Sequence, residues 1–148
     1  MAEIDQSLIG QWGPEGTLRV ETGKIREFAR AVKDPNPAFL ADAGALAPPT
    51  FLMTIAHWLG DLSKTRSAVK LDYRRLLHGE QEFEYLRPIR AGDVLTVRSR
   101  TKEVFEKAGK RGGKMLFIIG ETEYRNQRGE VVAYTRNTAI ETEGAVKE

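Results

Sequence analysis

The chain of 148 residues is long enough for one domain with a substantial core, and its composition, 41% hydrophobic and 30% charged, is typical of globular proteins. Its 23 basic and 21 acidic residues are interleaved and leave a net charge of +2, which gives no reason to expect nucleic-acid binding. The absence of cysteine excludes disulfides, thiolate metal sites and a cysteine nucleophile, and with only two histidines we expect no metal site.

No targeting or membrane segment is expected. The first ten residues contain early acids and no apolar stretch of signal-peptide length. The longest apolar run, residues 46–60, contains two prolines and a histidine and is too short to cross a bilayer. The sequence therefore predicts a cytoplasmic protein without membrane contact.

The first regular segments are predicted to be a short strand and a helix. Residues 16–23 alternate weakly, as in a strand, and apolar residues then recur at helical spacing from Ile25 to Val32. The helix is expected to end near Lys33, because Asp34 precedes a proline and helical backbone is disfavoured there.

The most apolar segment, residues 49–62, is predicted to be a central helix. Pro48 and Pro49 suit a helix start, and Thr50 can cap it. The segment is apolar on nearly every side, so we expect it to be buried all round. The polar stretch that follows, residues 63–75, is expected to be a loop.

Four long segments in the second half alternate or are β-branched and predict antiparallel strands. They span residues 79–89, 93–107, 114–126 and 130–143, with turns at 91–93, 109–113 and 126–129.

A sheet that curls around one apolar helix accommodates both halves of the chain. We therefore predict an α+β hot-dog fold, an antiparallel sheet wrapped around a central apolar helix. The whole chain, residues 1–148, is expected to be a single domain with its core at about residues 15–142. A closed β-barrel is the competing architecture, but it does not accommodate the apolar helix.

Four stretches in this order resemble the MaoC-like dehydratase family, particularly the type named for its N-terminal domain. They are KIREFARAVKDPNPAF from Lys24, APPTF from Ala47, LLHGEQEFEYLRPIRAGDVL from Leu76 and YRNQRGEVVAYTR from Tyr124. The resemblance implies hot-dog domains that form dimers or fused double domains. It also implies hydration of trans-2-enoyl thioesters to (R)-3-hydroxyacyl thioesters, or the reverse dehydration. Because the substrate carries coenzyme A or acyl carrier protein, no separate cofactor is expected.

The stretch DPNPAF, residues 34–39, contains the candidate catalytic loop. Active relatives have, in outline, Asp-x-Asn-Pro-x-His, which Asp34, Asn36 and Pro37 match, whereas Phe39 stands at the histidine position. The resemblance implies Asp34 and Asn36 as catalytic residues, since an Asp and a His around one water can supply the acid–base chemistry. Read without the resemblance, both are equally typical of turn formation. Phe39 cannot transfer a proton, so we expect it to be an apolar plug or to line an acyl tunnel.

The two histidines have different expected roles. His57 lies in the predicted central helix beside Trp58 and is expected to be packed and hydrogen-bonded. His78 lies at the entry to a strand, where it either orients a neighbouring loop or faces the cleft as a catalytic substitute for the missing histidine.

Substrate contacts are expected around the start of the central helix. Phe39, Ala47, Thr50 and Phe51 are the candidate substrate-binding residues, and the N–H groups of Thr50 and Phe51 are candidate donors to the thioester carbonyl. Lys107, Lys110, Arg111 and Lys114 surround a glycine-rich turn, which is either a solvated hairpin tip or a site for the phosphates of coenzyme A.

These features predict an enoyl-thioester hydratase or 3-hydroxyacyl-thioester dehydratase, or the partner subunit of one. Its partners would be the acyl-thioester substrate and a second hot-dog chain, in a homodimer or a hetero-oligomer. One alternative is a hot-dog dimer that binds an acyl thioester without turning it over. A weaker alternative is an acyl-CoA thioesterase in which Asp34 directs the water.

Overall fold

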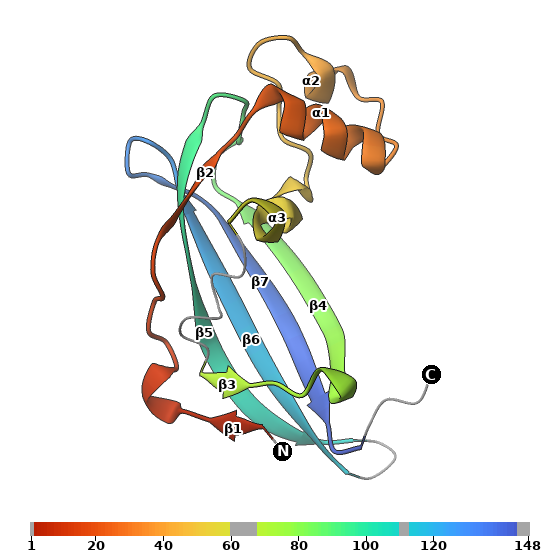
Figure 1. Cartoon of the computed structure of the whole chain (residues 1–148), viewed down its shortest axis with the longest axis vertical. Coiled ribbons are helices and arrows are strands. Elements are labelled where there is room, and N and C mark those ends of the chain that lie inside the picture. Colours follow the sequence, from red (N-terminus) through yellow and green to blue (C-terminus); the bar gives the residue numbers. More distant parts are fainter. Residues whose placement is uncertain (1, 60–67, 110–112, 145–148) are drawn as a thin grey trace.

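A five-stranded antiparallel sheet forms the frame of the molecule (Figure 1). The structure is a computed structural model that describes residues 2–59, 68–109 and 113–144. The strands lie in the order β2-β5-β6-β7-β4, so β2 and β4 form the two edges. They are β2 (Gly16–Arg19), β4 (Leu76–Tyr85), β5 (Val94–Ala108), β6 (Lys114–Arg125) and β7 (Val131–Thr142).

The remaining elements lie at the two ends of this sheet and in front of it. Figure 1 shows α1 and α2 together beyond one end, α3 in front of the sheet, and the β1–β3 ribbon near the other end. Their bounds are β1 (Glu3–Ile4), α1 (Thr22–Ala31), α2 (Pro37–Leu40), α3 (Ile55–Leu59) and β3 (Val69–Lys70), with 3-10 turns η1 (Gln6–Leu8), η2 (Phe51–Thr54) and η3 (Tyr73–Arg75).

The α+β hot-dog prediction is confirmed, and each predicted long segment contains a strand. The first of these strands, β4, begins three residues earlier than predicted, because Leu76 already pairs with Glu141 of β7. It ends at Tyr85, short of Pro88, which has no N–H for a ladder. A register shift between His78 and Glu80 marks a bulge at Gly79.

One face of the sheet carries the main hydrophobic core. Leu95 and Val97 of β5 and Tyr124 of β6 are fully buried, together with Ile25 of α1 and Phe51 of η2. Each such side chain contributes about 1.5–3 kcal/mol through removal from water. The core therefore fixes α1 and η2 against one end of the inner face.

The central helix differs from its prediction. A 3-10 turn, Phe51–Thr54, leads into α3, and residues 60–62 of the predicted range lie outside the described residues. Phe51 and Leu52 are buried, but Met53 and Trp58 are 49% and 44% exposed. The prediction of burial on every side is therefore wrong for the single chain, because the sheet covers only the side that faces it. His57 is also exposed rather than packed.

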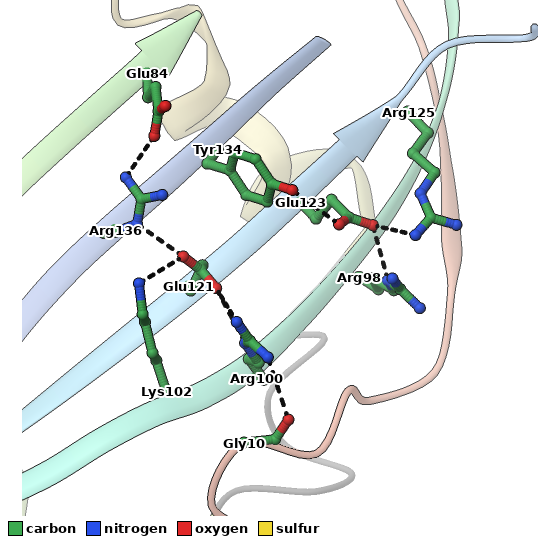
Figure 2. A network of polar contacts seen from close by, with 10 residues as sticks. All are labelled: Gly10, Glu84, Arg98, Arg100, Lys102, Glu121, Glu123, Arg125, Tyr134 and Arg136. Atoms are coloured by element: carbon green, nitrogen blue, oxygen red, sulfur yellow. Dashed lines mark hydrogen bonds and ion pairs between the residues drawn. The ribbon is translucent and has the colours of Figure 1, made fainter. Parts of the chain in front are cut away.

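The opposite face of the sheet carries a network of charges (Figure 2). The Glu121 side chain is 3% exposed and accepts hydrogen bonds from Arg100 at 2.6 Å, Arg136 at 2.7 Å and Lys102 at 3.2 Å. Burial works against this charge, but the three donors more than offset it and hold the pKa of Glu121 below its ordinary value. The carboxylate therefore ties β5, β6 and β7 together electrostatically.

Replacing Glu121 with glutamine should leave three cations around a neutral side chain and lower the free energy of unfolding at pH 7 by about 3 kcal/mol. Because the folded pKa is depressed, this contribution is fully present above the ordinary glutamate pKa of about 4.3 and is lost as the pH falls through the folded value. Urea unfolding at pH 7 and pH 3 should thus show a difference from wild type that shrinks in acid. Glu80→Gln, at an exposed position without an ion pair among the described residues, is the control. Equal stability of Glu121→Gln and wild type at pH 7 would contradict the prediction.

Candidate functional site

The candidate loop follows a C-terminal cap of α1 in which one residue, Lys33, has left-handed backbone. Lys33 has a φ of 57°, its N–H donates to the Arg30 carbonyl at 3.1 Å, and the Asp34 N–H donates to the Ala29 carbonyl at 2.9 Å. This is the hydrogen-bond pattern of a Schellman cap. The predicted helix end near Lys33 is confirmed, and the cap directs the chain into the loop at Asp34.

Asp34 and Asn36 both shape the loop through their side chains. One carboxylate oxygen of Asp34, Oδ1, accepts the Asn36 N–H at 3.0 Å, and Oδ1 of Asn36 accepts the Ala38 N–H at 3.0 Å, capping α2. Pro37 occupies the first turn of α2, where its missing N–H costs nothing. The turn-forming role is thus present, while Asp34 Oδ2 and Asn36 Nδ2 have no hydrogen-bond partner in the part of the chain that the structure describes.

At its far end, near Leu46, the loop is anchored to the connection between β4 and β5. Leu46 forms an isolated bridge with Arg90, and the Ala47 N–H donates to the Ile89 carbonyl at 2.8 Å. Between the two anchors, the Phe39 ring is 5% exposed and belongs to the main core. Phe39 therefore holds the loop against the core from within.

A cavity of about 240 Å³ opens between this loop and the end of β4. It is lined by Asn36, Phe39, Ala47, Pro49 and Tyr85, among others. Its volume is below the roughly 300–1,000 Å³ of sites that enclose a whole small-molecule ligand. It is therefore of a size to contact a short apolar group or the thioester end of a longer substrate.

Asp34 lines a separate cavity of about 440 Å³ between α1 and the loop. Arg26, Arg30, Lys33 and Leu40 also line it, so its wall is basic as well as apolar. The structure thus brings three predicted residues together, Asn36, Phe39 and Ala47, and places Asp34 on the adjoining surface.

Tyr85 is a cavity residue that the sequence analysis did not single out. Its hydroxyl donates to the Pro49 carbonyl at 2.6 Å, which connects the end of β4 to the segment before η2. Although Tyr85 is 38% exposed, partial burial raises its pKa to about 12, so it is a donor and not a base at neutral pH. The available signal was an aromatic residue at the end of an alternating strand, just before Arg87 and Pro88.

His78 is not brought to this cavity within the chain. It is exposed near the start of β4, whereas Tyr85 at the strand's end lines the cavity. Seven residues of extended chain separate them, which corresponds to about 20 Å. His78 therefore cannot take the place of the missing histidine in the same chain.

The predicted backbone donors are also mostly engaged. The Phe51 N–H donates to the Pro48 carbonyl at 3.0 Å, so it is not free for a thioester carbonyl. Thr50 precedes η2 without a capping side-chain hydrogen bond, and its N–H has no partner in the described part of the chain. Of the two proposed donors, only Thr50 keeps an available N–H.

The basic turn lies away from the candidate loop. Figure 1 places the end of β5 and the start of β6 at the opposite end of the sheet from α1 and α2. The Lys107 ammonium lies over the rings of Phe105 and Phe117, and Lys114 pairs with Glu106 at 3.7 Å. Lys110 and Arg111 lie outside the described residues. The contacts of Lys107 and Lys114 favour a solvated position over a phosphate site beside the cavity.

Three or more His, Asp or Glu side chains do not gather anywhere among the described residues in a way that could hold a metal ion. None of their helices has the length and apolar character needed to cross a membrane.

A curled antiparallel sheet with an apolar helical segment on its inner face is a hot-dog fold, and solved structures with this fold that resemble the chain include MaoC-like dehydratases. The chain belongs to the family described as "FAS1-like, dehydratase domain region", whose model matches residues 7–135. The resemblance predicted from the sequence is thereby confirmed.

Individual relatives agree with this assignment. A UPF0336 protein of Streptomyces coelicolor is 38% identical over 151 residues, covering 96% of this chain and 99% of the relative. A chain of the HadBC complex, a 3R-hydroxyacyl-ACP dehydratase from Mycobacterium tuberculosis, superposes with a TM-score of 0.73 at 24% identity, covering 93% of this chain and 99% of that one. A longer MaoC-like dehydratase gives a TM-score of 0.72 at 26% identity, covering 92% of this chain and 42% of that one.

Tyr85→Phe should lower the free energy of unfolding by about 1 kcal/mol, because the Pro49 carbonyl loses its donor. The raised folded pKa means that the wild type loses stability as the pH rises from about 10 to 12, since only the unfolded state releases the proton there. The gap between wild type and variant should therefore narrow in that window in urea unfolding. Tyr73→Phe, at a residue that is 74% exposed, is the matched control. A gap that stays constant up to pH 12 would count against the assigned environment of Tyr85.

Proposed function

We propose that this chain is a subunit of a MaoC-like enoyl-thioester hydratase or 3-hydroxyacyl-thioester dehydratase. A second hot-dog chain with the complete Asp/His loop supplies the acid–base chemistry, and this chain shapes the acyl pocket. One observation carries the proposal. Phe39 stands at the histidine position of an otherwise matching loop and is buried in the core, 5% exposed.

The chemistry of the reaction explains why this substitution matters. Hydration of an enoyl thioester needs a base for the water, a proton for the α-carbon and donors for the enolate oxygen. Phenylalanine offers none of these. Neither His57 nor His78 lines the cavity, and Tyr85 holds its proton at neutral pH. The cavity of one chain therefore lacks a proton-transfer group of suitable pKa.

The partner-subunit assignment has support from the relatives. The HadBC structure is named as a complex and as a 3R-hydroxyacyl-ACP dehydratase, and one of its chains shares the fold of this one. We take the substrate class to be thioesters of coenzyme A or acyl carrier protein, with no separate cofactor. The cytoplasmic location expected from the sequence stays a prediction.

The second candidate is an acyl-thioester-binding hot-dog dimer without catalysis. Phe39 favours it as well, because an apolar wall binds an acyl group whether or not a reaction follows. The thioesterase alternative is weaker. The carboxylate that would direct water, Asp34, lines the adjoining cavity and not the one beside Phe39.

Hydratase assays with crotonyl-CoA and longer enoyl-CoAs separate these functions. The chain alone should give only background rates, and a mixture with a MaoC-like chain from the same source that carries the full loop should exceed either component at least tenfold. The control mixture uses that partner with its loop histidine replaced by alanine. Substantial activity of this chain alone would overturn the proposal. A mixture no faster than the partner alone would favour the binding dimer.

Phe39→His tests whether the rest of the site is assembled within one chain. We expect no gain in hydratase rate, because Asp34 lies on the neighbouring cavity, and a loss of about 3 kcal/mol in unfolding free energy, since a polar ring replaces a buried apolar one. Phe39→Leu is the matched control, which removes the ring without adding an imidazole. A measurable gain with histidine but not with leucine would show that one chain holds a nearly complete acid–base site.

A further inference from the structure

The β4 strand leaves a long open edge. It runs for ten residues at the margin of the sheet, and not one of them is buried. No described strand pairs with its outer side, whose N–H and C=O groups are thus a template for another chain. Large apolar side chains are exposed along and beside it, Leu77 at 40%, Tyr85 at 38% and Leu86 at 54%.

This edge carries a row of carboxylates on the outer face of the sheet. Glu80, Glu82 and Glu84 alternate along β4 and therefore point to the same side. Arg136 donates to Glu82 at 2.9 Å and to Glu84 at 2.8 Å, and it also binds Glu121 at 2.7 Å (Figure 2 shows the last two contacts). Glu80 has no ion pair among the described residues. One shared guanidinium does not neutralise three carboxylates, so the edge stays negative.

Self-pairing along β4 would oppose like charges in every register centred on residues 80 to 84. Two copies related by a two-fold axis pair antiparallel, with residues of the same face directly opposite each other. In a register centred on residue 81, Glu80 of one copy lies opposite Glu82 of the other. One centred on residue 82 sets Glu80 against Glu84, and the other centres between residues 80 and 84 likewise oppose two glutamates. Like charges directly opposite each other destabilise a strand pair.

We propose that β4 selects a different hot-dog chain, one whose edge strand carries lysine or arginine opposite Glu80, Glu82 and Glu84. This inference rests on the proposed function and names the kind of partner that it requires. The apolar residues at the strand ends supply contact area, and the glutamate row supplies the choice of partner. Because Tyr85 ends β4 and lines the 240 Å³ cavity, a strand docked on β4 borders that cavity.

A charged edge can also serve only to prevent aggregation, with no partner at all. The exposed apolar side chains of Leu77, Tyr85 and Leu86 argue against this reading, because a purely protective edge gains nothing from them. The two readings differ in one measurable way. A partner-selecting edge binds a basic copy of itself, whereas a purely protective edge does not.

The basic probe is the full chain with Glu80→Lys, Glu82→Lys and Glu84→Lys together, mixed with isotopically labelled wild type. Sedimentation velocity and native mass spectrometry should show a 1:1 heterodimer at least tenfold tighter than either homodimer, and weaker at 0.5 M salt than at 0.05 M. The control carries the same charge change at exposed glutamates off β4, Glu15→Lys, Glu103→Lys and Glu106→Lys. It should not bind wild type more tightly than wild type binds itself.

A neutral variant keeps the test valid if the lysine variant does not fold by circular dichroism. Glu80→Gln, Glu82→Gln and Glu84→Gln together remove the repulsion in the registers centred on residues 80 to 84, so self-association should tighten at least tenfold over wild type. A tight wild-type homodimer that the neutral variant leaves unchanged overturns the inference, as does random mixing of the lysine variant with wild type. These readouts need no catalysis, so a failed hydratase assay beside confirmed charge-selected pairing would count against the proposed function alone.

Discussion

Burial of the Phe39 ring is the interaction on which the candidate site depends. The ring lies in the main core with Phe51 and Ile89, between the cap at Asn36 and the bridge at Leu46. Removing a buried phenylalanine side chain typically costs about 3–5 kcal/mol, a large part of the stability of a domain of this size. The same ring walls the 240 Å³ cavity and occupies the position where relatives have a proton-transfer group. Loop structure and chemistry are therefore coupled at one side chain.

The parts of the fold that follow local rules were predictable from the sequence. Alternation located the long strands, and the Asp34–Pro35 step located the end of α1, because both depend on backbone geometry near the residue concerned. The exposure of Met53 and Trp58 was not predictable in this way. An apolar helical surface indicates that its side chains will be buried against a neighbour, but not whether that neighbour belongs to the same chain.

The candidate site also combines features set by local sequence with features set by distant contacts. Asp34 and Asn36 were identified through the resemblance of their loop to the family pattern, and their turn-forming hydrogen bonds are local. Which cavity each residue lines depends on where the loop bridges to Arg90 in the β4–β5 connection, a contact between segments far apart in the chain. His78 failed as a substitute for the missing histidine for a related reason. A strand of ten residues carries its two ends far apart, so sequence proximity to a motif did not mean proximity to the cavity.

Under the proposed function, the glutamates on the outer face of β4 and the candidate loop both favour a partner chain of different sequence. A pair of identical chains would contain two loops with phenylalanine at the histidine position and hence no complete acid–base site. Only pairing with a different chain restores a complete acid–base site. The cavity cannot select that partner, because it lies at the end of β4 rather than along it. Selection of the partner must therefore occur along the edge of β4, where the strands of two chains would pair. Arg136 already shares its charge among Glu82, Glu84 and Glu121, so it cannot relieve a second row of glutamates opposite the first. The edge that disfavours a second copy of this chain therefore favours the assembly that its loop requires.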